Sequence, residues 1–434
     1  MIFSLKSKEA KNAFWLIGGR VLQMVLSLVV GVLTARYLGP GDYGLINYGS
    51  AYVAFFTSLC NLGLNSVIIK DFVDYPEEQG KTIGTALFMR LVSSILSSAM
   101  IVGIVSIVDK DEPLTIAVVA LCSVGSIFQI FETFNFWFQN QYKSKITSIA
   151  TLCAYVVTSI YKIILLILGK NVMWFAFATS VDYIVIAVFL YIAYKKNGGS
   201  KLSLSIIKGK SLLKTSYHYI LSSMMIAIYG HTDKLMLKQM LGDSEVGYYS
   251  IATAICAMWT FVLQAIIDSL YPTILRLHSI DKDKFNKKNR QLYAIVFYIS
   301  CFASIIITAL GDFAISILYG SQYIPAGLPL KIVTWYTAFS YLGVARNAWI
   351  VSEGRQRYLK FMYLGAVIIN IVLNLALIPS MGASGAALAS LITQIFTSII
   401  LPLFFKEMRP NAKLMLEAIL LRDVIKISNR GNVT

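Results

Sequence analysis

The sequence carries little charge for its length. Only 14% of its 434 residues are Asp, Glu, Lys or Arg, whereas 57% are hydrophobic and the mean hydropathy is +0.68. Soluble domains carry about 25% charged residues, because a surface that faces water needs them. This shortage of charge excludes an ordinary soluble protein and predicts an integral membrane protein.

Cysteines and enzyme motifs are also scarce. The five cysteines lie in apolar runs, without CxxC or zinc-ligand spacing: Cys60, Cys122, Cys153, Cys256 and Cys301. Such cysteines are typical of small buried hydrophobic side chains. The chain has no HExxH or GxSxG, and Leu204 replaces the first glycine of a P-loop that would end at Ser211. We therefore expect no catalytic residue, no metal site and no cofactor.

Long apolar runs recur from one end of the chain to the other. Each has about 20 residues or more, the length that crosses a bilayer core of about 30 Å. Twelve spans are expected, near residues 12–37, 43–69, 82–108, 114–141, 146–169, 172–194, 215–241, 247–275, 291–311, 326–352, 358–379 and 383–405. The first run is too long for a signal peptide, so we interpret it as an uncleaved span.

The basic residues predict the orientation of these spans. With a cytoplasmic N-terminus, 28 of the 38 Lys and Arg residues fall in cytoplasmic segments, five in outer loops and five inside spans. Cytoplasmic loops of membrane proteins carry such an excess, so both termini are predicted to be cytoplasmic. The net charge of +16 therefore reflects topology, and we expect no nucleic-acid partner.

The spans fall into two groups of six. We predict an N-terminal six-helix bundle at residues 1–196, an amphipathic cytoplasmic linker at 197–214, a C-terminal bundle at 215–406 and an amphipathic cytoplasmic tail at 407–434. The linker and the tail alternate Leu and Ile with basic residues, a pattern typical of helices that lie on an anionic membrane surface. A solvated linker and a disordered tail are the alternatives.

The two groups of spans resemble each other in sequence. The turn at residues 38–44 and the turn at residues 241–247 both read L-G-x4-G, 203 positions apart. A second match, 212 positions apart, pairs Trp137 with Trp349, Lys143 with Arg355 and Lys145 with Arg357. Both groups start in the cytoplasm, so this is a parallel internal repeat, and such repeats usually enclose a central site. The expected fold class is an all-α membrane protein with two six-helix bundles around a central cavity.

Five basic residues lie inside the predicted spans. A charge near the bilayer centre costs at least about 2.5–3.5 kcal/mol, so such residues are candidates for function. These candidate cavity cations are Arg20, Arg90, Lys162, Lys234 and Arg346. Cations at several depths in both halves suit a polyanionic substrate such as a diphosphate. Two alternatives stay open: Arg346 can extend to the membrane interface, and Lys234 can serve as an outer-interface anchor.

Acidic residues and a histidine lie in the spans as well. The candidates for ion coupling are Glu132, Asp182, Asp233, Asp268 and His231. His231 and Asp233 are the preferred pair, because histidine titrates near neutral pH. The alternative for His231 is a histidine that only forms a hydrogen bond between helices.

Three stretches carry a resemblance to a known family. Residues 34–44 are similar to the turn between the first two spans of polysaccharide flippases of the multidrug/oligosaccharidyl-lipid/polysaccharide exporter superfamily. Residues 232–250 resemble the start of the second half of these proteins, and residues 378–387 resemble their last external turn. The resemblance covers essentially the whole chain and includes O-antigen and capsule repeat-unit translocases.

The resemblance implies two bundles that alternate between inward-open and outward-open states. The implied substrate is an oligosaccharide linked to undecaprenyl diphosphate, which is moved to the outer leaflet of a bacterial inner membrane. Arg20 resembles the arginine in the first span of related lipid flippases, where it engages the diphosphate. Coupling to H⁺ or Na⁺, contacts with membrane lipids and contacts with other polysaccharide assembly proteins are further expectations.

Two other functions remain as alternatives. A cation-coupled drug antiporter of the same superfamily should have a net acidic site, whereas cations at least match the acids inside these spans. A membrane enzyme, such as a polymerase or a glycosyltransferase, generally needs a sizeable external loop for its catalytic residues. The outer loops of this chain are short, so we expect a transporter and no enzyme.

Overall fold

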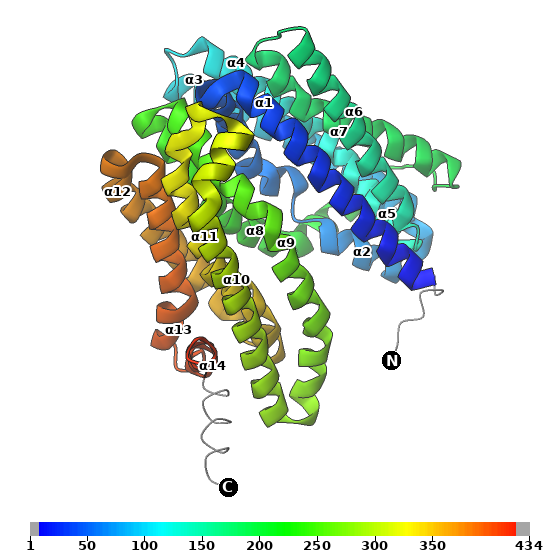
Figure 1. Ribbon diagram of the computed structural model, residues 1–434. Coiled ribbons are helices and arrows are strands. Elements are labelled where there is room, and N and C mark those ends of the chain that lie inside the picture. The colour runs from blue at the N-terminus through cyan, green and yellow to red at the C-terminus, as the bar shows by residue number, and fades with distance from the viewer. Residues whose placement is uncertain (1–7, 422–434) are drawn as a thin grey trace. The chain divides into compact units, whose positions relative to one another are not determined.

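The chain folds into helices along the part that the structure describes (Figure 1). This computed structural model describes residues 8–421, apart from the side chains of residues 8–22, 66, 221 and 222. Within residues 8–421 every regular element is a helix. The all-α fold class is confirmed.

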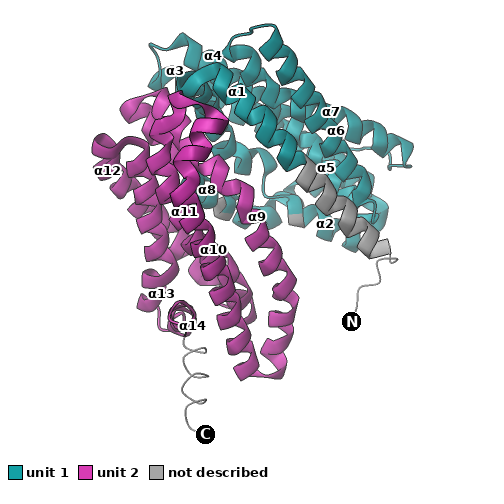
Figure 2. Cartoon of the chain, viewed as in Figure 1, with its two compact units in different colours: residues 1–231 teal, residues 232–434 magenta. Residues whose placement is uncertain are grey.

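Two compact units divide the chain at residue 231 (Figure 2). Unit 1 is residues 1–231 and unit 2 is residues 232–434. The boundary falls inside the helix α8 (Ile206–Leu241), so the predicted linker at residues 197–214 lies within unit 1. Each unit is described here by itself.

Within the described residues, unit 1 contains seven α-helices before α8. Their bounds are α1 (Lys8–Asn61), α2 (Asn65–Asp74), α3 (Gln79–Val108), α4 (Pro113–Phe128), α5 (Thr133–Asn140), α6 (Ser144–Ile167) and α7 (Val172–Lys196), with the 3-10 turns η1 (Pro76–Glu78) and η2 (Gln129–Glu132). Helix α1 packs against α3, α4 and α6, and α7 packs against α4 and α6. Phe72, Phe134, Phe138 and other buried side chains form a core of this unit.

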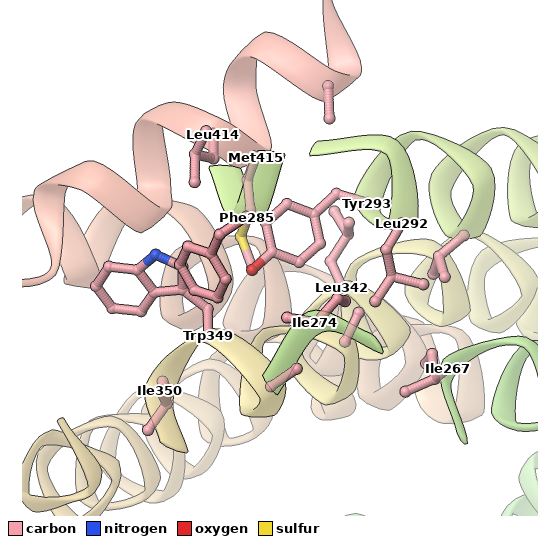
Figure 3. Close-up of a cluster of buried hydrophobic side chains, with 14 of the residues drawn as sticks. Ile267, Ile274, Phe285, Leu292, Tyr293, Leu342, Trp349, Ile350, Leu414 and Met415 are labelled. Atoms are coloured by element: carbon pink, nitrogen blue, oxygen red, sulfur yellow. The ribbon is translucent and has the colours of Figure 1, made fainter. Parts of the chain in front are cut away.

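Unit 2 contains the end of α8 and the remaining helices. Their bounds are α9 (Asp243–Ile280), α10 (Lys282–Tyr319), α11 (Gly327–Ser352), α12 (Leu359–Ile395), α13 (Leu401–Phe404) and α14 (Arg409–Ile419), with the 3-10 turns η3 (Ser321–Ala326) and η4 (Gln356–Tyr358) and the π-helical turn η5 (Phe396–Ile400). Helix α11 packs against α9, α10 and α12, and α14 packs on α10. Phe285, Tyr293, Trp349 and Met415 form part of the core between them (Figure 3).

Nine helical segments within the described residues are long and apolar enough to cross a membrane. The difference from the twelve predicted spans has two sources. Helix α1 joins the first two spans, because Gly39 (φ 75°) kinks it without ending it. The spans in α8 and α11 are too polar to count, since α8 carries His231, Asp233 and Lys234 and α11 carries Lys331 and Arg346.

The internal repeat is visible in the backbone. Gly39 and Gly242 occupy equivalent turns and share nearly the same conformation, with φ and ψ of 75° and 173° in one and 97° and −177° in the other. Gly169 (φ 62°) and Gly382 (φ 57°) form a second equivalent pair. Glycine is favoured at positive φ because it has no Cβ. The parallel repeat predicted from the sequence is therefore confirmed at the level of individual turns.

The junction between α9 and α10 differs from the prediction. The sequence suggested a polar loop near residues 276–290, but both helices continue through this region and only Asp281 separates them. The Asp281 side chain caps α10 by accepting hydrogen bonds from the backbone N–H groups of Asp283 and Lys284, each at 3.0 Å. These hydrogen bonds lower the pKa of the Asp281 carboxyl. Capping of this kind allows one residue to make the turn.

The start of α8 and the segment before it are attached to the rest of unit 1. Lys208 Nζ lies 2.8 Å from Asp71 Oδ1 and 3.0 Å from Glu78 Oε2. Burial lowers the pKa of Lys208, but the hydrogen bonds to Asp71 and Glu78 outweigh it, so the pKa is raised overall. Gly80 and Gly84 let the backbone of this segment approach α3 closely, since a Cβ on Gly84 would lie 2.4 Å from the Ser203 carbonyl oxygen.

Candidate functional site: two buried polar centres

Arg90 on α3 forms the polar centre of unit 1. Its side chain is 1% exposed. The two terminal nitrogens donate hydrogen bonds to Thr133 Oγ1 at 2.9 Å and to Asn65 Oδ1 at 2.6 Å. The Nε atom is buried without a hydrogen-bond partner, and the guanidinium lies over the Phe136 ring, 5.6 Å from its centroid. Both hydrogen-bond acceptors of this buried cation are therefore neutral groups.

A break in the fourth predicted span brings Glu132 and Thr133 close to Arg90. Helix α4 ends at Phe128, the 3-10 turn η2 follows, and α5 starts at Thr133. A 3-10 stretch inside a helix often marks a hinge or a functional site. Here the turn brings Glu132 within electrostatic range of Arg90 and brings the Thr133 hydroxyl to the guanidinium.

Three other predicted residues lie in unit 1 near this centre. Asp182 on α7 accepts a hydrogen bond from Thr158 Oγ1 at 3.2 Å. Its carboxylate interacts electrostatically with Lys162 on α6 and with Glu132. The structure thus brings four predicted site residues of unit 1, two cations and two acids, into one charged group whose formal charge is zero.

Asp233 on α8 forms the polar centre of unit 2. Its side chain is 5% exposed. Oδ2 accepts hydrogen bonds from Tyr249 OH and Ser390 Oγ, both at 2.6 Å, and Oδ1 accepts one from Asn374 Nδ2 at 2.7 Å. These three donors come from α9 and from both halves of α12, so the carboxylate joins three helical segments.

The neighbourhood of Asp233 is rich in oxygen atoms. Asn374 Nδ2 also donates to Asn370 Oδ1 at 3.1 Å, while the buried Asn374 Oδ1 has no hydrogen-bond partner. The kink at Gly382 turns α12 back on itself, which allows Ser390 to reach Asp233 and Asn370. Carboxylate, amide and hydroxyl oxygens are the ligand types that hard cations prefer.

Lys234 follows Asp233 on α8 and interacts with it electrostatically. The next basic residue of the helix, Lys238, is 7% exposed and forms an ion pair with Asp243 at 2.9 Å. His231 is half-buried and is the last residue of unit 1. Asp233 accepts its hydrogen bonds from Tyr249, Asn374 and Ser390, and its pairing with His231 stays a prediction.

Arg346 on α11 binds backbone carbonyls in unit 2. It is 6% exposed and donates through one terminal nitrogen to the Thr397 carbonyl at 3.3 Å and the Ser398 carbonyl at 3.4 Å. Both carbonyls belong to the π-helical turn η5, where the regular helical hydrogen bonds are interrupted. Arg346 therefore fastens this turn to α11.

Within the described residues, Asp268 is not among the contacts of either centre. Asp268 is exposed on α9 and accepts a hydrogen bond from Gln264 on the same helix at 2.9 Å. The side chain of Arg20 lies outside the described residues, although its backbone belongs to α1.

Sequence reasoning missed the neutral partners of both buried ions. Asn65 and Thr133 hold Arg90, while Tyr249, Asn374 and Ser390 hold Asp233. One signal was present in the sequence. Asn370 and Asn374 lie in an apolar run one helical turn apart, and side chains four residues apart share a helix face.

The family of this chain follows from a sequence match over more than half of its length. Residues 10–278, more than half of the chain, match the polysaccharide biosynthesis protein family. The chain belongs to this family. A curated relative of this family member is the probable flippase AglR of Haloferax volcanii, 23% identical over 417 residues that cover 91% of this chain and 83% of the relative.

Solved structures place this family member in a membrane fold. An inward-facing multidrug resistance MATE family transporter of the MOP superfamily is similar with a TM-score of 0.73 and 14% identity, covering 90% of this chain and 95% of that one. Lipid II flippase MurJ in an inward closed conformation gives a TM-score of 0.69 and 16% identity, covering 95% and 92%. The family member is a multi-pass membrane protein with the MOP-superfamily fold, in a family of transporters rather than catalytic enzymes.

Proposed function

We propose that this protein flips lipid-linked oligosaccharide repeat units from the cytoplasmic to the outer leaflet. The carrier would be undecaprenyl diphosphate, and the product would feed synthesis of O-antigen, capsule or exopolysaccharide. The observation that carries the proposal is the family match over residues 10–278, because members of this family serve polysaccharide synthesis. Alternating access of a central cavity in a bacterial inner membrane, with cytoplasmic termini, is part of the proposal.

Buried cations supply the chemistry for the diphosphate. Arg90 donates its hydrogen bonds to Asn65 and Thr133, both neutral, and Glu132 lies within electrostatic range of it. A guanidinium can bind two phosphate oxygens at once, which makes it suited to a diphosphate. Arg20 and Lys162 are proposed to act with Arg90 in unit 1, and Lys234 is proposed as a further diphosphate-binding cation in unit 2. We assign Arg346 to the π-helical turn that it already binds.

Asp233 is proposed to bind the coupling ion, Na⁺ or H⁺. It supplies a buried carboxylate among the oxygens of Tyr249, Ser390 and Asn374, and one Asn374 oxygen is without a hydrogen-bond partner. Glu132 and Asp182 in unit 1 are proposed as a second titrating pair. His231 and Asp268 are kept as further candidates for ion coupling.

The test is the location of the lipid-linked intermediate in cells. Deleting the gene should trap the intermediate in the inner leaflet, where an impermeant oxidant added outside cannot reach its sugars. Wild-type chain should restore oxidation, and normally expressed Arg20→Ala should not. Oxidation of the intermediate at the wild-type rate in the deletion strain would contradict the proposal.

A cation-coupled small-molecule antiporter is the second candidate. Its support is the similarity of the fold to a multidrug resistance MATE family transporter, with a TM-score of 0.73. An antiporter would leave the lipid intermediate unaffected by deletion and would raise the sensitivity of the deletion strain to cationic drugs. The same strain therefore separates the two functions. Contacts with other polysaccharide assembly proteins are proposed only for the flippase.

A further inference from the structure

Two arginines share one carboxylate at the turn that joins α11 to α12. Arg357 donates to both oxygens of Glu407, at 2.7 and 2.8 Å, and Arg355 forms an ion pair with the same carboxylate. The arginine side chains are 61% and 34% exposed. Two guanidiniums carry about ten N–H donors, whereas one carboxylate offers about four acceptor positions. The cluster therefore retains one positive charge and spare donors for another anion.

Large apolar side chains are exposed in the segments that adjoin this charged cluster in the sequence. Phe361, Leu403 and Phe404 are 45%, 37% and 71% exposed. They lie at the ends of two apolar segments, Gln356–Met381 and Ala383–Phe404, which are long enough to cross a membrane. Exposed aromatic rings beside basic residues at the end of a span are typical of the membrane–water interface. An anion that reaches this cluster thus approaches from the headgroup region of the bilayer.

The equivalent turn of unit 1 differs in its chemistry. Lys143 and Lys145 occupy the positions of Arg355 and Arg357, 212 residues earlier. Lys143 donates to Asn197 Oδ1, a neutral amide, at 3.2 Å. Lysine is a strongly hydrated point charge, whereas the arginine fork matches two oxygens of a phosphate. Lysine and arginine serve equally well as the basic residues that orient a span. The presence of two arginines at this turn of unit 2 therefore indicates a ligand that offers paired oxygen atoms.

We propose that Arg355 and Arg357, spaced by Glu407, bind the phosphate of an anionic phospholipid in the inner leaflet. The lipid phosphate accepts hydrogen bonds from the guanidiniums while its acyl chains lie along Phe361 and Phe404. Glu407 orders the two arginines and competes with the lipid for the same donors. This site lies within unit 2 and does not depend on which substrate the protein transports.

Lipid binding by the purified full-length chain tests the proposal. Native mass spectrometry after exchange into phosphatidylglycerol or phosphatidylcholine measures the lipid that each variant retains. Arg355→Gln with Arg357→Gln should weaken phosphatidylglycerol retention by roughly tenfold or more, because each basic residue near an anionic surface contributes about fivefold. Lys284→Gln with Lys287→Gln removes the same charge from exposed positions of α10 and should leave retention unchanged.

Glu407→Gln separates a lipid site from a structural ion pair. Removing the competing carboxylate should increase phosphatidylglycerol retention, whereas a purely structural pair would lose thermal stability with no gain in lipid. Arg355→Lys with Arg357→Lys keeps the charge and should bind at an intermediate level. Equal loss in the α10 control would overturn the proposal. Equal thermal protection by free inorganic pyrophosphate and by phosphatidylglycerol would overturn its assignment to a lipid.

Discussion

The two units bury ions of opposite sign by the same means. Arg90 in unit 1 donates its hydrogen bonds to neutral oxygen atoms, and Asp233 in unit 2 accepts its hydrogen bonds from neutral donors. Burial of an ion is costly unless hydrogen bonds replace its water. The two halves of the repeat therefore differ at their polar centres, so the roles proposed for Arg90 and for Asp233 can be tested separately.

Asp233→Asn should have the largest effect, because it removes the charge that three hydrogen bonds stabilise and that a coupling cation needs. We expect transport to be abolished while the protein still reaches the membrane. Ligand at a hundred times its dissociation constant stabilises a protein by about 2.7 kcal/mol, and the variant should lose this Na⁺- or proton-dependent stabilisation. Melting temperatures in NaCl and KCl at several pH values measure it.

Asp268→Asn is the matched control for this prediction. Asp268 is an exposed acid on α9 that accepts a hydrogen bond from Gln264 on its own helix. Its replacement should leave the ion dependence of the melting temperature unchanged. An Asp233→Asn protein that melts and transports like wild type would remove the cation role from unit 2.

Arg90→Met tests the opposite centre and should abolish transport. The variant leaves Asn65 and Thr133 without their charged partner, at a cost of about 1–3 kcal/mol in the free energy of unfolding. Arg346→Met should cost a similar amount, since it frees the Thr397 and Ser398 carbonyls, yet transport per folded molecule should persist. Transport assays normalised to folded protein distinguish the two arginines. Equal losses of normalised transport would show that both act on the substrate.

A matched pair of glycines compares the turns of the repeat. Gly169 and Gly382 have φ of 62° and 57°, so an alanine at either site is strained by about 1–3 kcal/mol. A Cβ on Gly382 would also lie 2.5 Å from a Glu245 oxygen, whereas on Gly169 the nearest atom is 3.7 Å away. Gly382→Ala should therefore lower the melting temperature more than Gly169→Ala. Equal shifts would show that backbone strain alone decides the effect.

The smallest effect is expected at the ion pair of Lys208. Its raised pKa means that it stabilises the folded state below the pKa of an unfolded lysine and that this contribution is lost as pH rises through the folded-state pKa. Lys208→Met should cost about 1 kcal/mol near pH 7, and the cost should shrink toward pH 11. Thermal melts across this range measure the difference, and a cost that is independent of pH would contradict the assignment.

The sequence predicted the fold better than it predicted the contacts of Arg90 and Asp233. Apolar runs fix the spans, and the glycines of the L-G-x4-G turns identify the repeat, because both depend on local composition and backbone preference. The contacts of Arg90 and Asp233 depend on pairings across helices, such as Asn65 with Arg90, whose residues are 25 positions apart. Neutral Asn, Ser and Thr residues are common in membrane helices, so the sequence does not single out these particular ones.

Two structural details were beyond the sequence for a physical reason. The polar stretch near Asp281 has the composition of a loop, but packing of Phe285 and Tyr293 into the core of unit 2 stabilises helix there (Figure 3). Arg346 was expected to bind substrate or to extend to the interface. Its hydrogen bonds depend on the π-helical turn η5. The sequence of that segment has no pattern that predicts a π-helical turn.

The single-residue junction at Asp281 connects two long helices, α9 and α10, without a loop between them. Each has 38 residues, or about 57 Å at 1.5 Å per residue. A rod of that length that tilts by about 10° moves its far end by about 10 Å. A spin label at Ile280, which is 72% exposed, would therefore magnify small rotations of these spans into distances that are easily resolved. A label at this junction therefore reports on the tilting of both helices at once.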